Sequence, residues 1–569
     1  MKPPHVQKPH KPLLYHSLSI WSLYTYREFL KKGPKKVSHL KFSAPSTLSL
    51  FEEKQVKVQL LNALSLLRHL QKVDLKQLKT SDSYYWNTRL LLTLKRNNSH
   101  VKTLLLPRQS RNCKERHFRH LGRLRHLDYR LQDWSPDWSK KTLPLKYLEY
   151  CSKIHSLKFV HYNEDCFFSD TFPSFRPYLK LLEGLVLHIN LWNQKELNFS
   201  FEVFKHLKSV SFKFPQIPAN QQFLEILMAS QSLPHLQEMT LYLTKYIALD
   251  FIEPFQQITQ RGMLKKVGLN FGEDTALSFT KTLEALKNCY NLSHFSLNIN
   301  LKGDELLKPI AEFIKGMSQL EYLQISLINE NLFSTNSDCG EICKQIGSLQ
   351  RLRSLKLRFK TKRSLYPSCI LSNFIPHLSG LFTKTIKIET FELECNQIYF
   401  AEALQDLIQT FGNSASFLRN LKIDFNNAFY IPKIHQLILN LLQNLSDIRT
   451  LEINCLDVND SKSLKDIAKT ICSLKYLTEF FMGEIKGRVF TSEFCDAVTA
   501  ISSKKGLRQF GCLLSQHFDQ RFGSGTRARN GLLFDIERII QKNPDLQNLS
   551  LNSDFDTAVS FQIHKWSVN

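Results

Sequence analysis

The side chains best suited to chemistry in this sequence are cations that gather between Arg108 and Arg130, interspersed with histidines. Most of them are arginines, whose planar guanidinium groups donate paired hydrogen bonds to phosphate. This composition predicts a phosphate-contacting surface, with RNA or DNA as its partner. The alternative is a solvated helix face that keeps a leucine-heavy chain soluble. The residues that we assign to the predicted anion site are Arg108, Arg111, Lys114, Arg116, Arg119, Arg123 and Arg125.

The distribution of charge along the chain favours this choice. The formal net charge is +25. Residues 1–150 hold 30 lysines and arginines against 10 acidic residues, whereas residues 151–569 hold 46 against 41. Such an asymmetry indicates an anionic partner for the N-terminal part of the chain: nucleic acid, a membrane surface or an acidic protein.

Two other sequence patterns contain residue types found in metal or phosphate sites, but neither pattern has all the residues that such a site requires. Cys113, His117 and His120 offer three metal ligands, but a structural zinc site needs a fourth, and the flanking arginines repel a cation. The stretch Phe522–Gly531 is rich in glycine but matches neither the P-loop nor the dinucleotide fingerprint, so we interpret it as a loop between repeats. Signatures of hydrolases, kinases and metalloproteases are missing from the sequence. We therefore predict a non-catalytic protein that holds no metal ion or cofactor.

A repeated spacing of apolar residues organises the chain. An apolar residue is followed at +3 and +5 by two more, as in Leu236/Met239/Leu241. We call this motif of three apolar residues the repeat phrase, and its clearest copies are 28 residues apart. Such a period predicts a solenoid, in which each unit packs on its neighbours. The units, about 18 of them, begin at Val37, Leu70, Val101, Leu124, Ile154, Leu182, Leu207, Leu236, Leu264, Leu292, Leu320, Leu352, Ile388, Leu418, Ile448, Leu477, Leu507 and Leu546.

Each unit has the parts of a strand followed by a helix. Residues at +3 and +5 share one face of a short strand because strand side chains alternate, and Asn300 is one of four asparagines at the ninth position. Apolar residues in Gly303–Gly316, Glu402–Phe411 and Ser461–Ile471 fall at helical spacing. These units resemble leucine-rich repeats of the ribonuclease-inhibitor type. The resemblance implies an α/β solenoid, a curved horseshoe with parallel strands on its concave face and helices on its convex face.

The array accounts for residues 37–569, of which 37–150 are strongly basic, and leaves residues 1–36 outside. This basic N-terminal segment has an apolar, aromatic stretch at Leu13–Leu30, which predicts a helical cap over the first repeat. A mitochondrial transit peptide is one alternative, opposed by scarce arginine and several early prolines. Another is a remnant of an F-box-like adaptor helix, although its Leu-Pro opening and trailing tryptophan are missing.

The outward strand positions, +2, +4 and +6 in the phrase, carry polar residues of both charge signs, such as Tyr322 and Glu394. A face of this kind predicts a polar, protein-binding surface rather than a hydrophobic groove. Lys356 and Arg358 fall at these positions, and together with Lys360 they are second candidates for an anion site.

The expected compartment is intracellular, because the cysteines show neither a zinc spacing nor a disulfide framework. The Asn-x-Ser sites at Asn291, Asn444 and Asn548 lie in or against the repeat phrase, where a glycan would collide with packing. No apolar run reaches the length of a membrane span. A nuclear or cytoplasmic location is favoured, with a mitochondrial one as the alternative, and we do not expect secretion.

Together these features predict a non-catalytic leucine-rich-repeat scaffold that mediates protein–protein interaction. It would bind protein along its concave face and dock on nucleic acid (RNA or DNA), or on another polyanion, through residues 1–150, as part of a larger complex. The rival hypothesis is a cytoskeletal or ubiquitin-ligase (F-box-like) adaptor whose basic end binds an acidic protein. Neither hypothesis includes a small-molecule substrate.

Overall fold

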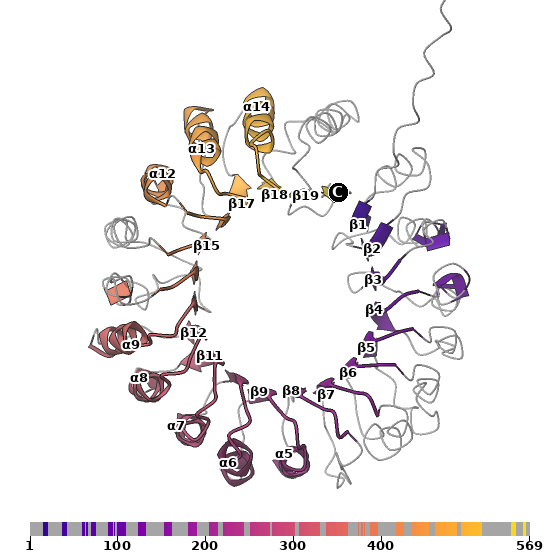
Figure 1. Ribbon diagram of the computed structural model, residues 1–569, viewed down its shortest axis with the longest axis vertical. Helices are drawn as coiled ribbons and strands as arrows, with labels where there is room; N and C mark the ends of the chain where they lie inside the picture. Colours follow the sequence, from indigo (N-terminus) through magenta and orange to yellow (C-terminus); the bar gives the residue numbers. More distant parts are fainter. Residues whose placement is uncertain are drawn as a thin grey trace, which may run out of the picture.

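Twenty short strands, all parallel except the last, form a single sheet in the computed structural model. The strands line the inside of a ring, and the helices cover its outside (Figure 1). This arrangement confirms the predicted leucine-rich-repeat solenoid. The structure describes residues 15–20, 37–42, 58, 60–62, 64–65, 70–75, 89–90, 92–94, 96, 100–109, 123–131, 153–161, 180–189, 204–213, 220–243, 251–272, 276–301, 306–329, 337–361, 374, 377–378, 381, 387–395, 417–425, 434–445, 447–454, 461–485, 491–514, 548–553 and 561–564.

Every predicted unit contributes a strand, and eight helices are described between the strands. The strands are β1 Tyr15–Ile20, β2 Val37–Phe42, β3 Lys72–Asp74, β4 Thr103–Gln109, β5 His126–Leu131, β6 Ser156–His161, β7 Gly184–Ile189, β8 Ser209–Lys213, β9 Glu238–Leu243, β10 Lys266–Phe271, β11 His294–Leu301, β12 Tyr322–Asn329, β13 Ser354–Thr361, β14 Thr390–Cys395, β15 Asn420–Phe425, β16 Thr450–Ile453, β17 Glu479–Ile485, β18 Gln509–Leu514, β19 Asn548–Ser553 and β20 Phe561–His564. The helices are α5 Asn220–Gln231, α6 Ile252–Gln260, α7 Ala276–Leu286, α8 Leu307–Gly316, α9 Ser337–Gly347, α12 Ile434–Asn444, α13 Ser461–Ser473 and α14 Thr491–Ser502.

The helices agree with the predicted ones where the structure describes them. Helix α8 occupies the later part of Gly303–Gly316, and α13 contains the predicted Ser461–Ile471. The predicted helix Glu402–Phe411 lies outside the described residues. Apolar residues of α8 face the sheet, and the ring centroid of Phe313 lies 4.6 Å from that of Phe295 on β11. A repeat is thus a strand and a helix that share one buried layer.

Neighbouring repeats are joined by a shared backbone carbonyl at the start of each strand. The carbonyl of Lys265 accepts the N–H groups of Ser293 and His294 at 3.0 and 2.9 Å. The carbonyl of Ser293 then accepts those of Glu321 and Tyr322 at 2.8 and 3.0 Å, and the same fork recurs from the carbonyl of Gln71 to that of Thr478. Each fork sets the register of one strand against the next.

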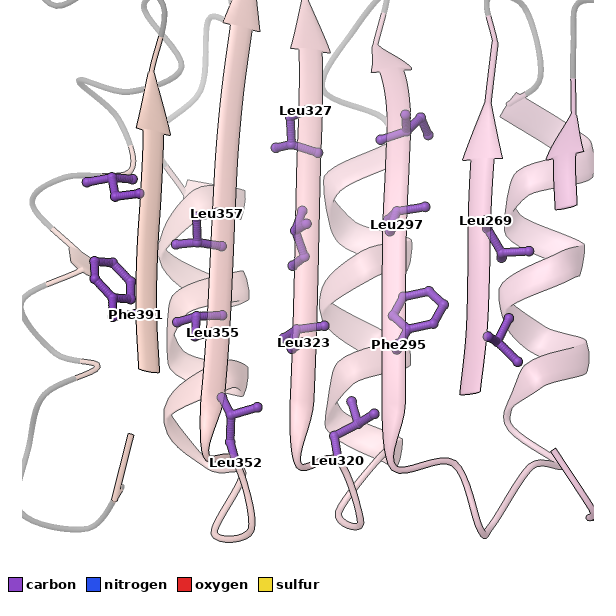
Figure 2. Close-up of a cluster of buried hydrophobic side chains, with 14 of the residues drawn as sticks. Leu269, Phe295, Leu297, Leu320, Leu323, Leu327, Leu352, Leu355, Leu357 and Phe391 are labelled. Carbon is purple, nitrogen blue, oxygen red and sulfur yellow. The ribbon is translucent and has the colours of Figure 1, made fainter. Parts of the chain in front are cut away.

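Because the register repeats, the apolar residues of the phrase stack into continuous rows. On β12 and β13, Leu323 lies opposite Leu355, and both are 0% exposed, as are the phrase-opening Leu320 and Leu352. Figure 2 shows these side chains pointing from the strands toward the helices. Burying a leucine stabilises the fold by about 1.5–3 kcal/mol. In a single repeat, however, these leucines would stay exposed on the side where the neighbouring repeat packs. The repeats must therefore stack to form a core.

The sheet begins earlier in the chain than the sequence analysis predicted. Strand β1 at Tyr15–Ile20 pairs in parallel with β2, with Leu18 opposite Leu40. The helical cap predicted over Leu13–Leu30 is therefore wrong for these residues. Tyr15, Leu18 and Ile20 have the +3 and +5 spacing of the repeat phrase, and this strand pairs with the free edge that β2 would otherwise expose.

A strand that no repeat phrase predicts joins the two ends of the array. Strand β20 pairs antiparallel with β19, where Leu549 lies opposite Ile563. It also pairs antiparallel with β1, where Leu18 lies opposite the same Ile563. Because β20 pairs with both β1 and β19, it closes the stack into a ring (Figure 1).

The core contacts predict a large effect for truncation at the sheet centre. Leu323→Ala removes a fully buried side chain between β11 and β13 and should lower the free energy of unfolding by about 2–5 kcal/mol. Met228→Ala on α5, where the side chain is 56% exposed, should change it by less than about 0.5 kcal/mol. Chemical denaturation measures both, and equal effects would contradict the packing.

Candidate functional site

The structure describes part of the predicted N-terminal anion site. Arg108 lies on β4, where the register places it opposite Arg130 of β5. Arg123 and Arg125 are exposed in the turn before β5, and the guanidinium of Arg123 contacts the imidazole of His100. The residues of this site that lie outside the described part of the chain are Arg111, Lys114, Arg116 and Arg119.

The second predicted group, Lys356, Arg358 and Lys360, lies on the inner face of β13 and is paired with acidic residues. Lys356 forms an ion pair with Glu392 on β14. Glu394, also on β14, forms ion pairs with Arg358 Nε at 2.7 Å and with Lys360 Nζ at 3.0 Å. Two carboxylates thus pair with the three cations of this group, which leaves less free positive charge for an anionic partner than the sequence indicated.

These pairs belong to a row of alternating charge that crosses four strands. Glu392 lies opposite Lys422 of β15 in the register, and Lys422 in turn pairs with Glu452 of β16. The row therefore reads Lys356, Glu392, Lys422, Glu452, all at the same position of the repeat phrase. Cross-strand pairs of opposite charge contribute about 0.2–1 kcal/mol each. Each side chain of the row is held by its neighbours in a fixed position on the inner face.

Two carboxylates beside this row have opposite electrostatic environments. Burial alone would raise the pKa of Glu394, but the hydrogen bond from Lys360 and the charge of Arg358 outweigh it, so the pKa is lowered. Burial raises the pKa of Asp424, and the charges of Glu394 and Glu452 add to that effect. Asn454 Nδ2 donates to Asp424 Oδ2 at 3.0 Å, which only partly compensates. The fold thus disfavours ionisation of Asp424 and favours that of Glu394.

A serine–histidine contact on β11 resembles part of a catalytic arrangement. Ser293 Oγ lies 2.8 Å from His294 Nδ1, and Ser293 Oγ also lies 3.3 Å from the carbonyl of Lys265. The imidazole of His294 stacks on the ring of Tyr322 with centroids 5.7 Å apart. Nucleophilic catalysis needs a third group that orients the base, and no carboxylate of the described residues contacts this imidazole. The contact positions two polar side chains on the inner face.

The described residues provide few groups for metal or thiol chemistry. Within the ranges given above, no group of three histidines, cysteines or acidic residues is arranged to hold a metal ion. Cys113, His117 and His120 lie outside those ranges. Burial raises the pKa of the Cys289 and Cys343 thiols to about 12. These thiols pack as small apolar groups. No helix in the described part of the chain is both long and apolar enough to span a bilayer.

The sequence analysis missed a set of cations in the turns that precede the strands. Lys153, Arg419 and Arg449 are exposed there, directly beside the first apolar residue of their phrases. The recurrence of these cations is visible in the sequence once the repeats are aligned on the first apolar residue of each phrase. It was missed because the basic residues were counted along the chain and not by repeat position.

The environment of Asp424 predicts opposite effects for two neighbouring acids. A raised folded-state pKa means that ionisation destabilises the fold, so stability is lost as the pH rises from the unfolded pKa through the folded one. Asp424→Asn should therefore stabilise the protein at pH 7, by up to about 1 kcal/mol. Glu452→Gln leaves Lys422 without its partner and should destabilise it by a similar amount. Thermal melts at pH 7 that move in the same direction for both variants would contradict this electrostatic account.

Comparison with known proteins finds the repeat architecture elsewhere at low similarity. No protein-family model and no curated protein matches the chain. Among solved structures, LegL7 from Legionella pneumophila is 11% identical over 62% of this chain and 98% of its own, with a TM-score of 0.33. Rad7, in its yeast complex with Elc1, is 12% identical over 82% and 98%, with a TM-score of 0.36. The Toll–Spatzle complex of Drosophila is 12% identical over 88% and 63%, with a TM-score of 0.30. At TM-scores this low, the fold assignment rests on the strand pairings of the chain itself.

Proposed function

We propose that this chain is a non-catalytic scaffold that binds a protein partner along the inner face of its sheet and docks on nucleic acid through its basic N-terminal region. The observation that supports the first part is the row of alternating charge on β13 to β16. Its members are half-buried, paired across strands and fixed in register. A fixed pattern of opposite charges selects a complementary partner and disfavours others, because like charges brought together destabilise a complex.

The inner face is large enough for specific binding. Twenty strands about 4.8 Å apart, each about 20 Å long, give roughly 1,900 Å², against about 800 Å² for each partner in a standard interface. The same spacing makes the ring about 30 Å across between backbones. A helix with its side chains is about 10–12 Å wide. The partner of this face is therefore a helix or another narrow element that enters the ring.

The second part of the proposal rests on composition and on the residues described so far. The excess of cations in residues 1–150 and the exposure of Arg123 and Arg125 suit contact with phosphates. The rival adaptor hypothesis loses one of its supports, because residues 15–20 form a strand of the sheet. A recruiting helix over those residues is incompatible with that pairing.

Neutralising the charge row should remove the protein partner. In the double variant Lys356→Gln, Glu392→Gln both members of a pair are changed, so no unpaired charge is left and stability changes little. Recovery of the bound protein in affinity capture after nuclease treatment, measured by mass spectrometry, should fall at least about tenfold.

The matched control is Lys344→Gln, Glu341→Gln, which removes an exposed ion pair of 3.5 Å from the outer helix α9. It should leave the captured protein unchanged. Equal recovery with the charge-row variant and the wild type would overturn the protein-binding part of the proposal.

Reversing charge in the N-terminal cluster should abolish nucleic-acid binding. Arg116→Glu, Arg119→Glu, Arg123→Glu replaces three phosphate contacts with repulsion, and wild-type binding should weaken steeply with salt because bound counterions are released. Fluorescence anisotropy with RNA and DNA probes measures both effects, and thermal stability should stay unchanged. Loss of folding in this variant would instead show that the cluster is structural.

A further inference from the structure

The turns that precede the strands form one continuous edge of the sheet. We define the strand-start rim by three positions in each repeat from Val101 to Leu507. They are the two residues that precede the first apolar residue of the repeat phrase and the single residue that follows it. Because all these strands are parallel and share one register, their starts lie side by side on the same edge. Figure 2 shows two of these turns below Leu320 and Leu352.

The strand-start rim concentrates positive charge. Its described residues include sixteen lysines and arginines, all of them exposed, against four acidic residues. The inner face carries both signs in cross-strand pairs, such as Lys266 with Glu238 at 2.7 Å. On the rim, within the described part of the chain, Lys208 is the one cation in an ion pair, with Glu183 at 3.4 Å. The charge that the fold leaves uncompensated is therefore on the rim.

The rim cations fall into two arcs. The first arc, at the starts of β4 to β8, holds seven cations and one acid from Lys102 to Lys208. The second arc, at the starts of β13 to β18, holds eight cations and two acids from Arg351 to Arg508. On the side of β9 to β12, the rim between the two arcs has Lys265 and Glu321, with no net charge. Figure 1 places β5 and β15, near the centres of the two arcs, on opposite sides of the ring.

This geometry fits a straight, rigid polyanion. At about 30 Å between opposite backbones, the arcs are separated by close to one turn of B-form DNA, about 34–36 Å. A duplex laid across the opening would present the same side of its phosphate backbone to both arcs. A flexible single strand could follow one arc, and a flat anionic membrane would face the uncharged part of the rim as well. Paired, opposite arcs favour the duplex.

We propose that the strand-start rim binds double-stranded DNA, which lies across the ring opening and is held at both arcs by phosphate contacts. This inference rests on the nucleic-acid docking proposed above and extends it to residues 351–508, far from the N-terminal cluster in sequence. The contacts are lysine and arginine side chains from turns, which position a duplex without reading its bases. Binding is therefore independent of sequence and depends strongly on salt.

The test neutralises the second arc in the full chain with Arg351→Gln, Arg419→Gln, Arg449→Gln. The probes are a DNA duplex of about 24 base pairs, which spans both arcs, and one of about 8, shorter than a helical turn. For the long duplex, the slope of log affinity against log salt should decrease in magnitude by about 3, one for each phosphate contact removed. The advantage of the long duplex over the short one should also disappear, because it requires both arcs at once.

The matched control is Lys315→Gln, Lys465→Gln, Lys469→Gln, which removes the same charge from the exposed faces of α8 and α13. It should bind both duplexes like the wild type. A first-arc variant, Arg125→Gln, Lys153→Gln, Lys205→Gln, should reproduce the second-arc result. Thermal melts measure whether each variant folds. If one arc variant fails to fold, the other arc variant still tests the proposal.

Three outcomes would overturn the rim proposal: unchanged duplex binding in a folded arc variant, a 24-nucleotide single strand that binds as tightly as the duplex, or capture by phosphatidylserine vesicles without duplex binding. The N-terminal dock is tested separately with Arg111→Gln, Arg116→Gln, Arg119→Gln. If that variant alone loses binding, the N-terminal dock stands and the rim proposal falls. If both arc variants lose long-duplex binding and this variant keeps it, the rim stands and the assignment of the dock to Arg111, Arg116 and Arg119 falls.

Discussion

The interaction on which the rest of this structure depends is the carbonyl shared between successive repeats. One carbonyl accepts two N–H groups of the following repeat, as Lys265 does from Ser293 and His294. The fork fixes where each strand begins against the one before it, and a slip of one residue would turn every apolar side chain to the wrong face. With the register fixed, residues at equal positions of the phrase must form rows. One row is apolar and buried, one is charged and paired, and one is basic and exposed.

The parts of the fold that could be predicted from sequence are those specified within a repeat. Spacings of +3 and +5 are local, and their recurrence predicted the strands from β2 to β19. Strand β1 carries the same spacing at Tyr15, Leu18 and Ile20, but an apolar, aromatic stretch was interpreted there as a helix. Strand β20 has only four residues and pairs antiparallel. Its place depends on two edges that exist only once the ring has formed, and no local pattern contains that information.

The candidate sites show where counting along the chain fails. Lys356 and Arg358 were placed on the correct face, yet their partners Glu392 and Glu394 lie 36 residues later and become neighbours only through the register. Proximity in sequence therefore overstated the free charge of this group. The converse error hid the rim, because Arg419 and Arg449 are 30 residues apart along the chain and become neighbours only through the pairing of β15 with β16. Charge in a solenoid has to be summed over equivalent positions of successive repeats, because those side chains lie together on the surface that a partner contacts.

The two kinds of charged row impose different requirements on whatever binds them. On β13 to β16 of the inner face, the described cations are paired with carboxylates, so a partner of that surface would have to match the pattern of both signs. On the rim, Lys208 is the one cation of the described residues that pairs with a carboxylate, and the proposed phosphate contacts would replace solvent and counterions at the others. The backbone forks hold successive strand starts at a spacing set by the sheet, so the backbone positions of the rim cations are fixed relative to one another. One register thus places a face of paired charges and an edge of exposed cations on the same strands.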